Sequence, residues 1–237
     1  MTTRRLFLSP DRISEDRAML TAEAVHYLRD VLRLGPGARV ELFDGAGNSY
    51  PARLDADLAS LQLGPRRAAR PQMALWLLVA LAKGEKTDFV VQKATELGVT
   101  RVSPFAAARS VVRLDRERSG ARAERWRRIA AEAARQCGRA DVPLVDEPVS
   151  LAEALKPVPN GFARLVFHPG GEPLAGEPGG AGVAAVIGPE GGFSPEEVDS
   201  CEAAGARFVS LGPRILRAET AAVVAAALLQ ARFGDLA

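Results

Sequence analysis

The stretch that decides the fold is AAVIGPEGGFSPEEV, residues 184–198. An apolar run leads into a loop with three glycines, and Ser-Pro-Glu-Glu follows. A serine before a proline, with a glutamate three positions after the serine, is typical of a capped helix start. The stretch therefore predicts a buried strand, a glycine-rich loop and a helix from Pro195. In α/β proteins such a loop, at the carboxyl end of a strand, is where ligands bind.

The glycine loop allows two interpretations. Glycines let main-chain amides approach a ligand closely, but they also serve a tight turn between strand and helix. The loop lacks the lysine of a P-loop and the spacing of a dinucleotide fingerprint, so a phosphate cradle is disfavoured. A second passage of the same kind, RFVSLGPRILRAETAAVVAA at 207–226, places Arg214, Arg217 and Glu219 in its turn. These loops either converge on one pocket, or their charged groups form salt bridges with each other.

Residues 73–237 and 1–70 differ in pattern. From residue 73 onward, apolar strands alternate with helical segments, which predicts an α/β domain with a largely parallel sheet. Residues 1–70 hold short alternating runs, several glycines and one helical stretch at 25–34, which is typical of a small β-rich module. The polar stretch GPRRAARPQ at 64–72 separates the two, so we expect domains at 1–70 and 73–237. The strands expected in the second are 73–82, 99–105, 142–147, 164–168, 183–188 and 207–212.

Composition narrows the class of protein. The chain has 237 residues, 31 basic and 29 acidic side chains and 47% hydrophobic residues, as in ordinary globular proteins. Its longest apolar run has ten residues, about half of the roughly 20 that a membrane-spanning helix needs. No secretory signal is expected, so we predict a cytoplasmic protein without a membrane partner. Cys137 and Cys201 are far apart and have no neighbouring cysteine or histidine, which predicts no metal site and two reduced core thiols.

The net charge of +2 hides a strong asymmetry. Residues 101–140 hold eleven arginines against four acidic side chains, a net charge of +7, and residues 141–237 carry a net charge of −7. A concentration of arginine attracts polyanions, so nucleic acid is one candidate partner. A solvated helix face is equally compatible with the pattern, because Glu124 and Arg128 form an i,i+4 pair that supports a helix without any ligand.

Five ordered motifs carry a resemblance to a known family. KGEKTDFVVQKATELGV (83–99), RSVVR (109–113), RWRRIAAEAARQCGRADVP (125–143), IGPEGGFSPEE (187–197) and LGPRILRAETA (211–221) resemble the bacterial 16S ribosomal RNA uridine-N3 methyltransferases of the SPOUT class. RRLFL, His26 with YLRDVLRL, and ELFDG match the front module of that family. The chain departs from the family pattern at Arg135, where an acidic residue is common, and at Ala218, where threonine is frequent.

The resemblance implies a fold, a cofactor and partners. The expected fold class is α/β: a SPOUT-type methyltransferase domain with a deep trefoil knot, preceded by a small PUA-like RNA-binding β-barrel. The expected cofactor is S-adenosylmethionine. The expected partners are 16S ribosomal RNA, in the assembled small ribosomal subunit, and a second copy of the chain in a homodimer. The cofactor-binding residues carried over are His168, Gly188, Pro189, Glu190, Gly191, Gly192, Leu211, Gly212, Ile215, Leu216 and Arg217.

The implied chemistry selects candidate side chains. Methylation at uracil N3 requires loss of the N3 proton, because the protonated nitrogen has no free lone pair. Glu190, Glu219 and His168 are candidate proton acceptors, and Arg217 is the first candidate to stabilise charge on a uracil oxygen. Glu190, Glu219 and Arg217 are therefore the predicted catalytic residues. Arg4, Arg5, Arg109, Arg113 and Arg139 are candidate phosphate contacts, with a solvated surface as the alternative for each.

Two other functions remain open from the sequence. A related SPOUT enzyme would methylate transfer RNA ribose instead of uridine N3. An RNA-binding scaffold that has lost its cofactor is the other alternative, although the retained Gly188, Gly191, Gly192 and Gly212 argue against it.

Overall fold

The chain consists of two compact units. The computed structural model describes residues 4–70, 72–110, 116–176 and 180–236. The first unit is Met1–Pro71 together with Ala131–Val142, and the second is Gln72–Ala130 together with Pro143–Ala237. The chain therefore changes unit close to the boundary expected from sequence. The two continuous domains expected from sequence, 1–70 and 73–237, do not anticipate that Ala131–Val142 belongs to the first unit.

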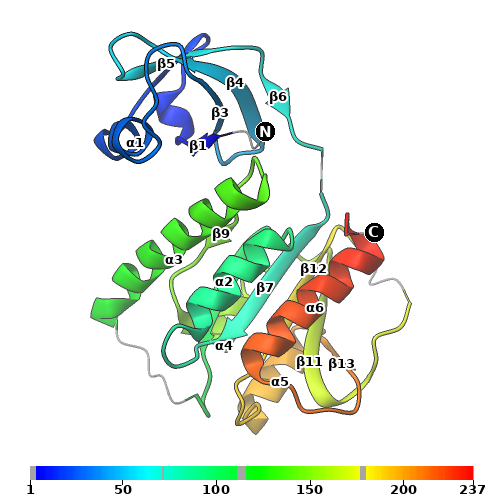
Figure 1. Ribbon diagram of the computed structural model, residues 1–237. Coiled ribbons are helices and arrows are strands. Elements are labelled where there is room, and N and C mark those ends of the chain that lie inside the picture. The colour runs from blue at the N-terminus through cyan, green and yellow to red at the C-terminus, as the bar shows by residue number, and fades with distance from the viewer. Residues whose placement is uncertain (1–3, 71, 111–115, 177–179, 237) are drawn as a thin grey trace. The chain divides into compact units, whose positions relative to one another are not determined.

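The first unit is built on one curled sheet. Its order is β1-β3-β4-β5-β2, and β6 pairs with β4. Side chains on one face of the sheet, such as Val40, Leu42, Ala52, Leu54 and Leu61, form the core of the unit. Figure 1 draws the strands of this unit in blue to cyan. Their bounds are β1 Arg5–Phe7, β2 Arg17–Met19, β3 Arg39–Phe43, β4 Asn48–Leu54, β5 Ser60–Leu63 and β6 Arg67–Ala68.

The helical stretch of the first unit begins earlier than the sequence predicts. A 3-10 turn, η1 Pro10–Arg12, precedes it, and α1 Ala22–His26 continues into the π-helical η2 Tyr27–Val31. Thr21 caps α1 by accepting a hydrogen bond from the Ala24 amide. The His26 ring pairs with Asp30 across one turn, Nδ1 to Oδ2 2.7 Å, so His26 supports this helix.

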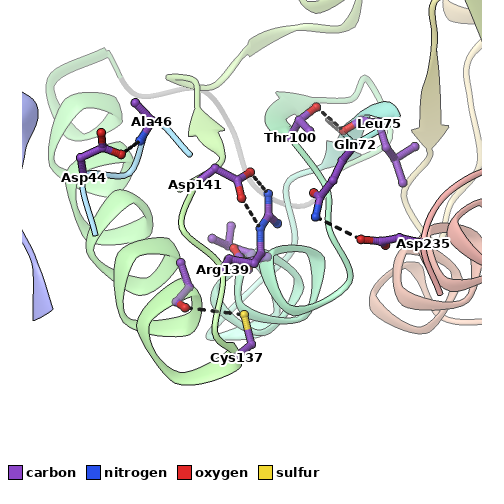
Figure 2. Close-up of polar contacts among 12 residues, drawn as sticks. Asp44, Ala46, Gln72, Leu75, Thr100, Cys137, Arg139, Asp141 and Asp235 are labelled. Carbon is purple, nitrogen blue, oxygen red and sulfur yellow. Dashed lines mark hydrogen bonds and ion pairs between the residues drawn. The ribbon is translucent and has the colours of Figure 1, made fainter. Parts of the chain in front are cut away.

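A buried carboxylate closes the turn between β3 and β4. Asp44 is 5% exposed and accepts hydrogen bonds from the amides of Ala46, at 2.8 Å, and Asn48, at 2.9 Å. Figure 2 shows the Asp44 side chain facing Ala46. An aspartate whose carboxylate accepts hydrogen bonds from amides two and four residues later in the chain stabilises the turn through local contacts.

The second unit contains a parallel sheet, as expected. Its order is β10-β8-β7-β12-β11-β13, with β9 beside β8, and each pair is parallel. All six strands expected from sequence in this region are present. The structure adds the short β10. The bounds are β7 Ala74–Ala80, β8 Arg101–Ala106, β9 Leu144–Val145, β10 Val149–Ser150, β11 Phe162–Pro173, β12 Gly182–Ile187 and β13 Arg207–Ser210.

Helices cover this sheet. α2 Lys86–Glu96 and α6 Ala218–Phe233 lie side by side, and α6 contacts β7 and β12 (Figure 1). α4 Leu151–Leu155 and α5 Pro195–Ala203 share a core cluster with alternate side chains of the strands, among them Leu78 and Val186. Because all six residues of β12 are buried, this strand reads as a continuous apolar run.

The long helix α3 spans Arg116–Cys137. Within the second unit, Trp126 is 4% exposed and its indole N–H donates to Asp88 Oδ1 at 2.9 Å, so Trp126 is a core residue of that unit. The expectation of two core thiols is half wrong, because Cys201 is buried but Cys137 is exposed. Cys137 is the last residue of the helix and lies beyond its last buried residues, Ala133 and Ala134. No helix in the described part of the chain has the length and apolar character that a membrane span requires.

Candidate active site

A cavity of about 390 Å³ lies at the ends of β12 and β13 and at residues 167–169 inside β11. These strands are neighbours in the order β12-β11-β13, so the loops after β12 and β13 and this segment of β11 meet at one edge of the sheet. The volume is in the range of small-molecule sites. We call it the strand-end cavity; it is lined by Arg109, Phe167, His168, Pro169, Ile187, Gly188, Pro189, Glu190, Gly191, Gly192, Phe193, Leu211, Gly212, Arg214, Ile215, Leu216, Ala218 and Ala221.

The loop after β12 is held at both of its ends. A Cβ atom on Gly188 would stand 2.8 Å from the Phe193 ring, so only glycine lets the chain pass that buried ring. Gly192 has a φ of +71°, which is left-handed backbone. At the far end, the Ser194 and Glu197 side chains form the predicted capping box with each other's main-chain amides. The loop is thus packed and capped without any ligand.

The loop near His168 arises from an irregularity inside β11. The strand runs to Pro173, but its register against β13 shifts between Phe167 and Glu172, both of which pair with Val209. Four residues, 168–171, are therefore displaced from regular pairing. The Gly170 amide donates a hydrogen bond to His168 Nδ1 at 3.1 Å. A neutral His168 then carries its hydrogen on Nε2, where it is a donor.

Lys86 links Glu190, which lines the cavity, to Glu219, which does not. At the start of α2, its Nζ lies 2.9 Å from Glu190 Oε1 and 3.3 Å from Glu219 Oε1. The hydrogen bond from Lys86 lowers the pKa of Glu190, and the Arg217 charge adds to this effect. The second Glu219 oxygen, Oε2, is buried and has no hydrogen-bond partner among the described residues. Lys86 therefore keeps Glu190 ionised and ties the loop after β12 to the start of α6.

The structure brings most of the predicted cofactor residues together. Every residue of that set from His168 to Leu216 lines the strand-end cavity, and Arg217 does not. Arg217 is exposed and Glu219 does not line the cavity either, so Glu190 alone of the three predicted catalytic residues does. Arg214, which the sequence placed in one of the two converging loops but not in the predicted cofactor set, also lines the cavity. Lys86 stands in the quoted motif 83–99, yet nothing in the sequence marked it as a partner of these loops.

The predicted phosphate contacts scatter over both units. Arg109 lines the strand-end cavity, where its Nη1 lies 3.4 Å from the Gly191 carbonyl oxygen. Arg113 is outside the described residues. Arg4 is exposed in the first unit.

Arg5 and Arg139 are engaged inside the first unit. The Arg5 side chain is 10% exposed, and its guanidinium donates to Glu41, at 3.2 Å, and to the carbonyls of Ala134, at 3.0 Å, and Arg139, at 2.9 Å. Arg139 is 8% exposed and pairs with Asp141, as Figure 2 shows. Because their donors are used inside the fold, these placements give both arginines a structural role and count against phosphate contact.

Comparison with known proteins gives the same picture for both units. A family model described as RNA methyltransferase domain matches residues 69–230, and one described as RNA methyltransferase PUA domain matches residues 20–63. A curated relative from Synechocystis, named Ribosomal RNA small subunit methyltransferase E, is 34% identical over 96% of this chain and 77% of its own length.

Two solved structures match over the full length of both chains at 31% identity. The Ribosomal RNA small subunit methyltransferase E of Neisseria gonorrhoeae, bound to S-adenosyl methionine, has a TM-score of 0.89, and a Legionella pneumophila protein in complex with the cofactor SAM has 0.86. The expected fold class, a SPOUT-type α/β domain after a PUA-like β-rich module, is confirmed; the trefoil knot stays a prediction. On these matches, the chain belongs to the RNA methyltransferase family that includes the ribosomal RNA small subunit methyltransferase E proteins.

Proposed function

We propose that this chain uses S-adenosylmethionine to methylate N3 of a specific uridine in 16S ribosomal RNA. The observation that carries the proposal is the strand-end cavity, formed by three adjacent loops in a chain that belongs to an RNA methyltransferase family. The assembled small ribosomal subunit is the proposed form of the substrate, and the cytoplasm is the proposed location.

The residues of the cavity fit this cofactor. Its walls combine apolar side chains, such as Ile187 and Leu216, with main-chain groups of glycine loops. Apolar walls suit an adenine ring, and main-chain amides and carbonyls suit its ring nitrogens and amino group. Gly188 keeps the loop close to Phe193, which leaves the space beside it open. When bound, S-adenosylmethionine supplies an electrophilic methyl group on a sulfonium sulfur.

Neither candidate acceptor in the cavity is suited to hold the N3 proton. Glu190 has its pKa lowered by Lys86, and a stronger acid is a weaker base. His168 already uses Nδ1 to accept the Gly170 amide hydrogen. We therefore assign the proton to solvent, and the enzyme's part to stabilising the uracil anion that remains.

Arginine side chains at the cavity fit that task. Arg109 and Arg214 both line it, whereas Arg217 lies outside the lining. A guanidinium group directs several N–H donors at an oxygen and keeps its charge at every physiological pH. Charge that develops on a uracil oxygen next to N3 would be stabilised by such donors in the transition state. The role that sequence gave to Arg217 is thus better filled by Arg109 and Arg214.

The proposed assembly is a homodimer. Apolar residues occupy every side of α6, including the partly exposed Leu228, and Ile215 is 85% exposed at the cavity. A helix that is apolar all round is usually buried on all sides. A second copy of the chain is the partner that we propose for this surface. Sedimentation of the purified protein at several concentrations tests this.

The decisive experiment combines substrate and product. The protein is incubated with methyl-labelled S-adenosylmethionine and, in separate reactions, with assembled small subunits, free 16S ribosomal RNA or transfer RNA. Nucleosides from the labelled RNA are then identified by mass spectrometry. We expect N3-methyluridine in the small-subunit reaction, and little label with Arg109→Ala or Arg214→Ala. A ribose-methylated nucleoside from transfer RNA, or no label in any reaction, would contradict the proposal.

A further inference from the structure

The outer face of the first unit's sheet has a second hollow, of about 750 Å³. Its floor includes Pro51 and Gly64, which carry little side chain; a Cβ on Gly64 would meet the Pro51 carbonyl at 3.1 Å. Four arginines and one glutamate supply its charged lining. We call it the arginine hollow; it is lined by Arg4, Arg39, Val40, Glu41, Pro51, Ala52, Arg53, Gln62, Leu63, Gly64 and Arg67.

The positive charge of the hollow is not neutralised inside the fold. Arg4, Arg39, Arg53 and Arg67 are all exposed, and in the described part of the chain none of them forms an ion pair. The one acidic lining residue, Glu41, is instead paired with Arg5 at 3.2 Å. The hollow therefore presents four guanidinium groups to an outside partner.

The strand register makes this charge unfavourable for folding. Arg39 on β3 lies directly opposite Arg53 on β4, so their Cβ atoms are about 5 Å apart on the same face. Like charges at opposite positions of an antiparallel pair are destabilising. An anion bound between the two arginines would offset this repulsion. The relief of the repulsion would then favour binding of the anion.

We infer that the arginine hollow binds the phosphodiester backbone of RNA. Guanidinium groups form paired hydrogen bonds with phosphate oxygens. None of the residues that line the hollow is aromatic, so it offers no platform on which a base could stack. The hollow therefore holds the RNA without reading its sequence. The inference rests on the proposed function only in choosing RNA as the polyanion, and it assigns three residues, Arg39, Arg53 and Arg67, that the sequence did not single out.

The test separates RNA binding from cofactor binding. A fluorescein-labelled single-stranded RNA of mixed sequence is titrated with the full chain at several salt concentrations, and cofactor binding is measured by calorimetry. For Arg39→Gln/Arg53→Gln we expect about tenfold weaker RNA binding, and a salt dependence whose log–log slope is smaller by about 2. Cofactor affinity should not change. The matched control, Arg12→Gln/Arg33→Gln, removes the same charge from exposed positions outside the hollow and should leave RNA binding within about twofold of the parent chain.

A second variant excludes unfolding as the cause. Arg53→Glu places a carboxylate opposite Arg39, so the melting temperature should stay the same or rise while RNA binding falls further. RNA binding that the hollow variants leave unchanged, beside normal cofactor binding, would overturn the inference and leave the proposed function standing. So would binding of the parent chain to phosphatidylglycerol vesicles but not to RNA. A parent chain that binds RNA through the hollow but never binds S-adenosylmethionine would support the hollow and refute the proposed function.

Discussion

In the second unit, the strand-end cavity is formed by loops whose glycines and buried rings leave a shaped space, and its charged neighbours are mutually paired. In the first unit, the arginine hollow is lined by four arginines on or next to regular strands, and in the described part of the chain none of the four forms an ion pair. The cavity therefore depends on close packing and the hollow on electrostatics. Changes of side-chain size should weaken ligand binding in the strand-end cavity, and changes of charge or of salt concentration should weaken binding in the arginine hollow.

The same contrast separates the arginine hollow from the arginine-rich segment 101–140. That segment carries a net charge of +7, yet many of its arginines are paired with acidic residues of the same unit. Arg101 binds Asp146, Arg125 binds Asp88 and Arg127 binds Glu124. A stretch of sequence rich in arginine therefore does not by itself predict a surface of unpaired arginines, because the fold can pair them with acidic residues.

The largest effect expected from a single change is at Gly188. Gly188→Val should remove measurable cofactor binding, and Gly188→Ala should weaken it roughly 10- to 100-fold, because the new Cβ would stand 2.8 Å from the Phe193 ring. Binding of single-stranded RNA should not change in either variant. Calorimetry with S-adenosylmethionine measures the first effect and fluorescence anisotropy the second.

Two variants make the Gly188 result specific. Gly161→Ala is the control, since its Cβ would lie an ordinary 3.8 Å from Ala181. Phe193→Leu combined with Gly188→Ala should restore part of the affinity by removing the obstructing ring. If Gly188→Ala binds the cofactor normally, the role given to this loop is wrong.

The two cysteines report on the two units separately. Cys201 in α5 is fully buried, and burial raises the pKa of its thiol to about 11, whereas Cys137 is exposed. At neutral pH a thiol reagent should label Cys137 rapidly and Cys201 only when α5 opens. Cofactor at 100 times its dissociation constant should slow Cys201 labelling about 100-fold and leave Cys137 unaffected.

Peptide mass spectrometry after timed labelling measures both rates in one sample. Cys137→Ser serves as a control for reagent consumption. Equal labelling rates for the two thiols would contradict the burial of Cys201 in α5. A Cys201 labelling rate that the cofactor does not change would show that cofactor binding does not stabilise the second unit against opening of α5.

Arg5 and Arg53 distinguish a structural arginine from a binding one in the same sheet. Arg5→Ala should lower the free energy of unfolding of the first unit by about 2–3 kcal/mol, because Glu41 and three main-chain carbonyls lose a charged donor. Arg53→Ala should change it by less than about 0.5 kcal/mol, since the side chain is exposed.

Spectroscopy can assign the effect to a unit, because both tyrosines, Tyr27 and Tyr50, lie in the first unit and both tryptophans, Trp76 and Trp126, in the second. Denaturant unfolding followed by tyrosine signals and by tryptophan fluorescence should therefore shift separately for Arg5→Ala. Equal stability of the two variants would mean that Arg5 is not needed for the fold.

Sequence predicted most of the fold because its elements have strong local signals. The strand at 182–187 is an uninterrupted apolar run, and Ser194 and Glu197 form the capping box that their spacing predicts. The allocation of Ala131–Val142 to the first unit had no such signal, because it depends on contacts between distant residues. The exposure of Cys137 was missed because the helix continues past its last buried residues, Ala133 and Ala134.

The candidate site divides in the same way. The glycine loops could be predicted from motifs, and the cofactor set that they carry does line one cavity. The arginines could not, because tertiary contacts decide which charges are paired. Arg5 and Arg139 are engaged, whereas Arg39 and Arg53 face each other across the strands and form no ion pair with any residue that the structure describes. Lys86 was missed for the same reason, since its partners are more than 100 positions away.

Lys86→Met should have the smallest effect and is the finest test of how the cavity loops are held. Lys86 joins Glu190 in the loop after β12 to Glu219 in α6, across groups that are partly exposed, so its loss should weaken cofactor binding only up to about fivefold. Lys83→Met, at an exposed position three residues earlier, is the matched control, and Lys86→Arg should retain most of the affinity.

The pH dependence shows whether Lys86 acts through Glu190. Because Lys86 holds the pKa of Glu190 below 4.5, its ordinary value, this pair stabilises the fold above that pH and the gain is lost as pH falls through the lowered pKa. The stability difference between the parent chain and Lys86→Met should therefore be full near neutral pH and vanish in acid. A difference that persists unchanged in acid below the lowered pKa, where Glu190 is protonated, would mean that the lysine acts through packing instead, and that charge pairing does not hold the cavity loops.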